Sequence, residues 1–259
     1  MSQLILKNAK CYIDGAFAAK DIFISDGKIA SFSTPCCAFE QIRVLDCTGY
    51  FVVPGFIDIH THGANGVDIN RATEVDLSAL SAFFASKGTT AFLASVLTDS
   101  QDNTLRILQT IAHYKMHANS GAVLLGAHLE GPFLSKEKKG AMPEAYLQNA
   151  DIDLFERYLS TGVVKYITVA PEIAGGREFI EYAAKKIPVA IGHSAASYCV
   201  ALEAVHLGAV ASTHTFNGMR GLDRVEPAVL GAVLESDIYN ELIADGRHVH
   251  PANMRLLNR

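Results

Sequence analysis

The stretch FVVPGFIDIHTHG, residues 51–63, decides the fold. Its apolar run FIDIH leads into two histidines, His60 and His62, which are two residues apart. Residues i and i+2 of a strand point to the same face, so both imidazoles would be directed at one point. Ligand-type side chains at the carboxyl end of a strand are typical of the mouth of a parallel α/β barrel.

Three other apolar runs end in the same way. They are AVLLGAHLEGPF (122–133) with Glu130, PVAIGHS (188–194) with His193, and AVASTHTFN (209–217) with His214. A carboxylate at the end of an apolar strand is costly unless it is paired or bound to a cation. Imidazole and carboxylate groups bind zinc, iron, cobalt or manganese, and zinc is the ion we expect. The four endings predict a hydrolase metal centre with one ion, or with two ions that share Glu130.

Amphipathic helical segments alternate with these runs, which indicates βα units and a parallel sheet. Thr73 and Asp76 predict a capping box at the start of the first helix. Seven strands can be counted: FIDIHTH, TTAFLASV, AVLLGAHLE, VKYITVAPE, PVAIGHS, AVASTHTF and ELIADG. Asp245 would end the seventh. We therefore predict a (β/α)8-type TIM barrel over residues 55–259 with seven strands visible, and expect the eighth to be missing. His128, in phase with Glu130, is interpreted either as a group that holds a ligand or as a core histidine.

Residues 1–54 have a different sequence pattern, with short runs rich in β-branched residues and few helical stretches. Asp14-Gly15 and Asp26-Gly27 predict hairpin turns. Pro54-Gly55 marks the crossing into the barrel. We predict a small β-sheet module over residues 1–54.

The composition excludes several classes of protein. The chain has 259 residues, a net charge of −5 and no basic block, so neither nucleic acid nor an anionic membrane is an expected partner. No apolar run reaches the roughly 18 residues that a membrane helix needs, and the first residues do not read as a signal peptide. The five cysteines, which include the adjacent Cys36 and Cys37, favour a reduced, cytoplasmic compartment.

The motifs PGFIDIHTHG, HLEGPF, VAPE, GHS, HTFNGMRG and IADGRHVHP occur in this order. In them the chain resembles the N-acetylglucosamine-6-phosphate deacetylase family of the amidohydrolase superfamily. The resemblance implies a metal-dependent barrel beside a small β-sandwich that both chain ends form, so we expect the sandwich to be incomplete without its C-terminal strands. It also implies removal of acetate from a 6-phosphorylated amino sugar, and a homodimer.

The resemblance also implies roles for individual residues. Glu130, His193 and His214 would hold the main ion, and His60 and His62 match the H-x-H of members that can hold a second ion. Gly140 and Ala141 match the segment that contacts the sugar, and Asn217 and Gly218 match the backbone that binds the phosphate. His248 matches a catalytic histidine near the substrate carbonyl. Arg224 matches an arginine that reaches the phosphate across the dimer, although the spacing R-V-E-P is one residue longer than usual.

Family members carry an acid–base aspartate on the eighth strand, and no residue of this sequence matches it. We therefore expect metal binding with little or no turnover. Three alternatives stay open. One is another amidohydrolase that acts on a cyclic amide, such as a dihydroorotase or hydantoinase; its bridging lysine would have to be Lys165, which lies at the wrong end of its strand. The others are a non-catalytic sugar-phosphate-binding remnant, and a chain that does not fold stably because its barrel is unclosed.

Overall fold

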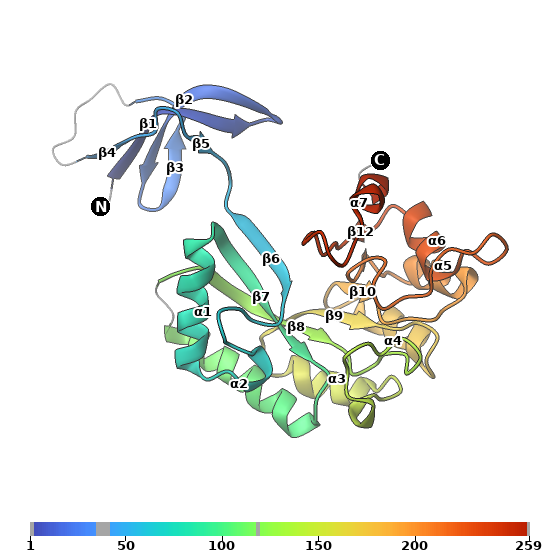
Figure 1. Cartoon of the computed structure of the whole chain (residues 1–259). Coiled ribbons are helices and arrows are strands. Elements are labelled where there is room, and N and C mark those ends of the chain that lie inside the picture. The colour runs from blue at the N-terminus through green and yellow to red at the C-terminus, as the bar shows by residue number, and fades with distance from the viewer. Residues whose placement is uncertain (1–2, 35–41, 118–119, 258–259) are drawn as a thin grey trace. The chain divides into compact units, whose positions relative to one another are not determined.

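The computed structural model describes residues 3–34, 42–117 and 120–257. The chain divides into two compact units, Met1–Phe56 and Ile57–Arg259 (Figure 1). The predicted division into a β-sandwich module and a barrel at Pro54-Gly55 stays a proposal. Cys36 and Cys37 lie outside the described residues, while Cys11, Cys47 and Cys199 are free thiols.

The first unit is a five-stranded sheet. Its strands are β1 (Gln3–Ile13), β2 (Ala16–Ser25), β3 (Lys28–Ser31), β4 (Arg43–Asp46) and β5 (Phe51–Val52). They run in the order β3-β2-β1-β4, and β5 also pairs with β1. Both predicted hairpin turns are confirmed: Asp14-Gly15 and Asp26-Gly27 join antiparallel strands and have positive φ at both positions. This is the conformation that two-residue hairpin loops require.

The second unit is built on a seven-stranded sheet of order β12-β11-β10-β9-β8-β7-β6. Its strands are β6 (Phe56–Thr61), β7 (Thr89–Leu97), β8 (Val123–Glu130), β9 (Val164–Val169), β10 (Val189–Ile191), β11 (Ala211–Ser212) and β12 (Tyr239–Asn240). From β7 to β12 each strand pairs in parallel with the next. This is the α/β barrel-type arrangement that the sequence predicts.

Helices alternate with these strands. They are α1 (Glu74–Ser86), α2 (Gln101–His117), α3 (Ile152–Leu159), α4 (Gly176–Ala183), α5 (Tyr198–His206), α6 (Ala228–Glu235) and α7 (Pro251–Leu257), with short 3-10 turns η1 (Ile69–Arg71) and η2 (Glu144–Tyr146). Figure 1 shows α1 to α4 along the outside of the curved sheet. The core lies between these two layers and contains the fully buried Leu77, Leu80, Phe155 and Phe179. Burial of one such side chain stabilises the fold by roughly 1.5–3 kcal/mol.

The predicted start of α1 is confirmed. The Thr73 hydroxyl accepts a hydrogen bond from the Asp76 amide, and the Asp76 carboxylate accepts one from the Thr73 amide. These bonds satisfy two amides that a helix start otherwise leaves unpaired. Within the described residues, no helix is both long and apolar enough to span a bilayer.

The predicted position of the seventh strand is wrong. The strand is Tyr239–Asn240, which pairs with β11, and not ELIADG at 241–246. The Glu241 amide donates to the carbonyl of Ser212 at 3.0 Å, and the chain then leaves the sheet. Asp245 therefore lies in a turn and not at a strand end, where its carboxylate accepts from the amides of Arg247 and His248. The run Leu242–Ala244 is apolar without belonging to the sheet, which is why hydropathy alone misplaced the strand.

Candidate metal centre

Four histidines surround the carboxylate of Glu130, which is 2% exposed. Glu130 Oε1 lies 3.0 Å from His193 Nε2, 2.9 Å from His214 Nε2 and 3.5 Å from His60 Nε2. Glu130 Oε2 lies 3.1 Å from His62 Nε2. The structure thus brings together all five predicted ligands. They form two groups of possible ligands that share Glu130: His60 with His62, and His193 with His214.

The ends of the strands explain this convergence. Glu130 is the last residue of β8, and His60 lies near the end of β6. His193 and His214 each follow a short strand by two residues and have left-handed φ values of 47° and 31°. Histidine is among the non-glycine residues that occur more often in this region. At both positions the chain leaves the sheet in a left-handed conformation, and the imidazole of the same residue contacts Glu130.

In three of these rings the other nitrogen contacts a main-chain carbonyl, which fixes the position of its proton. Nδ1 of His62, His193 and His214 lies 3.2, 2.8 and 3.1 Å from the main-chain carbonyls of Ser95, Lys138 and Asn217, respectively. A carbonyl only accepts, so each of these Nδ1 atoms carries a proton, and Nε2 is the nitrogen that each ring turns towards Glu130.

The Nε2 atoms also lie close to one another in pairs. His193 Nε2 lies 3.1 Å from His214 Nε2, and His60 Nε2 lies 3.2 Å from His62 Nε2. Nitrogens this close to one another and to one carboxylate are arranged as the ligands of a shared cation would be. The donor set therefore fits a divalent ion, because imidazole nitrogen and carboxylate oxygen are common ligands of zinc and similar metals.

The charges in the cluster shift its pKa values. Burial would raise the pKa of Glu130, but hydrogen bonds from His193, His214 and the other two histidines hold it well below its usual value. Burial would likewise lower the pKa of His60, but its contacts with two carboxylates, Glu130 and Glu241, raise it to about 10. The carboxylate of Glu130 is therefore ionised at neutral pH and attracts cations.

His128 lies below the cluster and is fully buried. Its Nδ1 lies 2.9 Å from the hydroxyl of Ser95 and its Nε2 lies 2.8 Å from that of Thr168. Its ring also contacts the ring of His60, with centroids 4.6 Å apart. Burial lowers the pKa of His128 to about 3, so it is a neutral side chain that supports His60 by packing.

Sequence reasoning missed Glu241. Its Oε2 lies 2.9 Å from His60 Nδ1, and its Oε1 accepts a hydrogen bond of 2.5 Å from the hydroxyl of Tyr166 on β9. Glu241 directly follows β12, so it is a carboxylate at a strand end, as Glu130 is. The same pattern pointed to Glu130, but the expected seventh strand began at Glu241, so this residue was placed at the start of a strand and not at its end.

The residues expected to contact substrate lie at different distances from the cluster. A Cβ on Gly140 would lie 3.4 Å from His193 Cε1, and one on Gly218 would lie 3.1 Å from His193 Nδ1, so both glycines border the ligands. Asn217 contacts His214 through its main-chain carbonyl. Ala141, Arg224 and His248 are exposed. The His248 ring contacts Asp245, with Nδ1 2.7 Å from Oδ2, so the structure does not bring it into the ligand groups.

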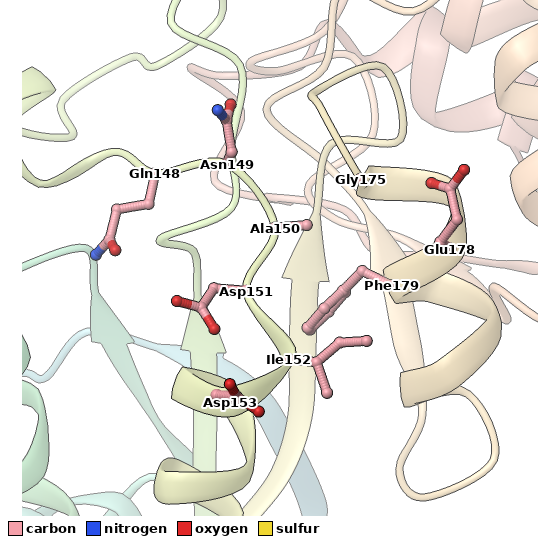
Figure 2. Close-up of a pocket in the computed structure, with 9 residues that line it drawn as sticks. All are labelled: Gln148, Asn149, Ala150, Asp151, Ile152, Asp153, Gly175, Glu178 and Phe179. Carbon is pink, nitrogen blue, oxygen red and sulfur yellow. The ribbon is translucent and has the colours of Figure 1, made fainter.

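Two hollows differ in what they can accept. One of about 810 Å³ lies between β6 and the segment 239–244, and its lining includes His60, His62, His214 and Glu241. The other, of about 560 Å³, lies between the segment leading into α3 and the start of α4 (Figure 2). Its acidic side chains Asp151, Asp153 and Glu178 disfavour an anionic ligand, and Asp151 already caps α3. The first hollow is therefore the candidate site for a substrate at the metal centre.

Comparison with known proteins agrees with this geometry. The model of the amidohydrolase family matches residues 51–259, and the chain therefore belongs to that family. The N-acetylglucosamine-6-phosphate deacetylase of Bos taurus is 36% identical, over 97% of this chain and 65% of its own length. That of Lysinibacillus sphaericus is 35% identical, over 92% and 62%. The crystal structure of the enzyme of the same name from Pasteurella multocida superposes with a TM-score of 0.91 at 30% identity, covering 99% of this chain and 68% of that one.

The predicted resemblance to N-acetylglucosamine-6-phosphate deacetylases and the predicted fold class are thus confirmed. The chain spans about 65% of the length of the bovine relative.

Proposed function

We propose that this chain is a divalent-metal-dependent deacetylase that hydrolyses N-acetylglucosamine 6-phosphate to glucosamine 6-phosphate and acetate. The observation that carries the proposal is the convergence of four Nε2 atoms on the Glu130 carboxylate, with the nitrogens of each pair only 3.1–3.2 Å apart. The relatives support the substrate. A variant of the Mycobacterium smegmatis deacetylase, 28% identical with a TM-score of 0.88, was solved in complex with N-acetyl-D-glucosamine-6-phosphate.

In this proposal Glu130, His193 and His214 hold the main ion, and His60 and His62 share Glu130 to hold a second. Zinc is the favoured ion, since tetrahedral sites of imidazole and carboxylate suit it, with iron, cobalt and manganese as alternatives. When bound, such an ion supplies Lewis-acid polarisation of the amide carbonyl and a water of lowered pKa.

The substrate would lie against the two glycines that border the ligands. Gly140 and Ala141 would contact the sugar, and Asn217 and Gly218 the phosphate. The side-chain nitrogen of Asn217 supports this, because it is buried and has no hydrogen-bond partner among the described residues. A buried donor without a partner is costly, and a ligand oxygen would satisfy it.

Two assignments need a rearrangement or a second subunit. His248 would stabilise the developing oxyanion, but it now contacts Asp245 and would have to turn away from it. Arg224, which is exposed, would reach the phosphate in a homodimer. We also propose a cytoplasmic location, in keeping with a phosphorylated sugar as substrate.

Metal analysis and a deacetylation assay test the proposal. Protein prepared without chelators should contain a divalent metal and lose it in Glu130→Gln, whereas Glu137→Gln, which changes an exposed carboxylate, should keep it. Acetate release from N-acetylglucosamine 6-phosphate should require that metal, even at a low rate. Metal-loaded protein that binds the sugar phosphate without releasing acetate would favour the non-catalytic remnant. A protein without bound metal would exclude the proposed chemistry.

A further inference from the structure

One of the four histidines has a different partner from the rest. Nδ1 of His62, His193 and His214 contacts a neutral main-chain carbonyl. Nδ1 of His60 instead lies 2.9 Å from a carboxylate, that of Glu241. A carboxylate behind a metal-binding imidazole fixes its tautomer and increases the basicity of the nitrogen that faces the ion.

Glu241 is itself held firmly enough to orient another side chain. Its second oxygen accepts from the Tyr166 hydroxyl at 2.5 Å, and its side chain is 10% exposed. Its main chain is also fixed, because its amide donates to the carbonyl of Ser212 and its carbonyl accepts from the amide of Thr215. Glu241 is thus held by contacts from β9, β11 and the turn after β11, in addition to its contact with His60.

We infer that Glu241 is a positioning residue for the His60–His62–Glu130 group of ligands. It holds the proton of His60 on Nδ1, so that Nε2 faces Glu130, and its charge strengthens cation binding at this group relative to the group formed with His193 and His214. The inference rests on the proposed metal centre. It goes further in naming a residue that controls whether the centre holds a second ion.

The first test is a zinc titration of the wild-type protein and of Glu241→Gln, with a chelator of known affinity as competitor. Glutamine keeps the shape of the side chain and removes its charge. We expect the wild type to bind zinc at both groups, and the variant to bind it about 10- to 100-fold more weakly at one of them. Glu235→Gln is the matched control, since Glu235 also accepts from a tyrosine hydroxyl, that of Tyr198, but lies at the end of α6 and belongs to neither group of candidate ligands. It should bind zinc as the wild type does.

A double-mutant cycle separates positioning from a general structural effect. If Glu241 acts through His60, Glu241→Gln should change the zinc affinity less than about twofold in a His60→Gln background. An equal loss in both backgrounds, or no loss in the wild-type background, would overturn the inference. Wild-type protein that binds no zinc at all would instead overturn the proposed metal centre.

A spectroscopic measurement needs no variant of Glu241. In zinc-loaded wild-type protein, long-range nitrogen–proton NMR spectra should show a His60 ring that is protonated at Nδ1 and metal-bound at Nε2. The His60→Gln spectrum assigns the signal. A His60 ring that carries its proton on Nε2 would refute the inference even if Glu241→Gln failed to fold.

Discussion

Gly218 provides a direct test of how closely the ligand geometry is set. It has a φ of +58°, and an added Cβ would lie 3.1 Å from His193 Nδ1 and 3.2 Å from His214 Cε1. Gly218→Ala therefore places one methyl group against the outer side of two ligand rings. Because the Gly218 carbonyl also accepts from the amide of Ser194, the main chain has little room to move away.

Two separate costs follow from this substitution. An alanine in the left-handed region costs about 1–2 kcal/mol of folding stability. In addition, the rings must shift by a few tenths of an ångström, whereas metal–ligand distances tolerate about ±0.2 Å. We expect the affinity for zinc to fall about tenfold, which corresponds to about 1.4 kcal/mol.

A matched glycine separates the two costs. Gly66 has a φ of +84°, and a Cβ there would meet no atom within 4 Å. Thermal melts of chelated protein should show a similar loss of stability in Gly66→Ala and Gly218→Ala. Zinc titrations should show weaker binding in Gly218→Ala alone. Equal zinc affinities in the two variants would refute the argument that Gly218 sets the positions of the rings.

Three other outcomes are expected. Burial would raise the pKa of Asp99, but hydrogen bonds from the next amide and from Asn70 and Asn103 hold it below its usual value. The stability from Asp99 is therefore present above a pH of about 4 and is lost as the pH falls through the lowered pKa, so urea melts of wild type and Asp99→Asn should differ at pH 5 and converge towards pH 2. Phe155→Ala should destabilise by about 3–5 kcal/mol, because Phe155 is fully buried against Phe179, whereas Ile152→Ala, which changes an exposed residue of the same helix, should cost far less; similar melts for both variants would contradict this packing. Removal of metal by a chelator should lower the melting temperature reversibly, since metal at 100 times its Kd stabilises by about 2.7 kcal/mol, and an unchanged melt would contradict metal binding.

The grouping of the candidate ligands could be predicted from the sequence because strand ends converge. In a parallel sheet the carboxyl ends of all strands lie at one edge, so the run before Glu130 and the runs before His193 and His214 were enough to group these residues. The same logic failed for Glu241. The strand before it has only two residues, and the apolar segment after it resembles a strand, so hydropathy placed the boundary on the wrong side.

The hydrogen-bond partners of individual side chains could not be predicted from the sequence. His128 was open to two interpretations, and only the positions of Ser95 and Thr168 show that hydroxyl groups on neighbouring strands occupy both of its nitrogens. His248 was expected beside the substrate carbonyl, but its nearest carboxylate, Asp245, is three residues away in the same turn. Local contacts of this kind compete with a distant site, and no spacing pattern reveals which one prevails.

The left-handed backbone at His193 and His214 bears on how such a centre can be lost. Asparagine and glycine adopt this conformation more readily than most residues. Substitution of either histidine by asparagine or glycine would therefore remove a candidate ligand without adding strain to the backbone. Such a variant would keep the fold and lose part of the candidate metal centre. The backbone at these two positions therefore does little by itself to preserve the proposed centre against substitution.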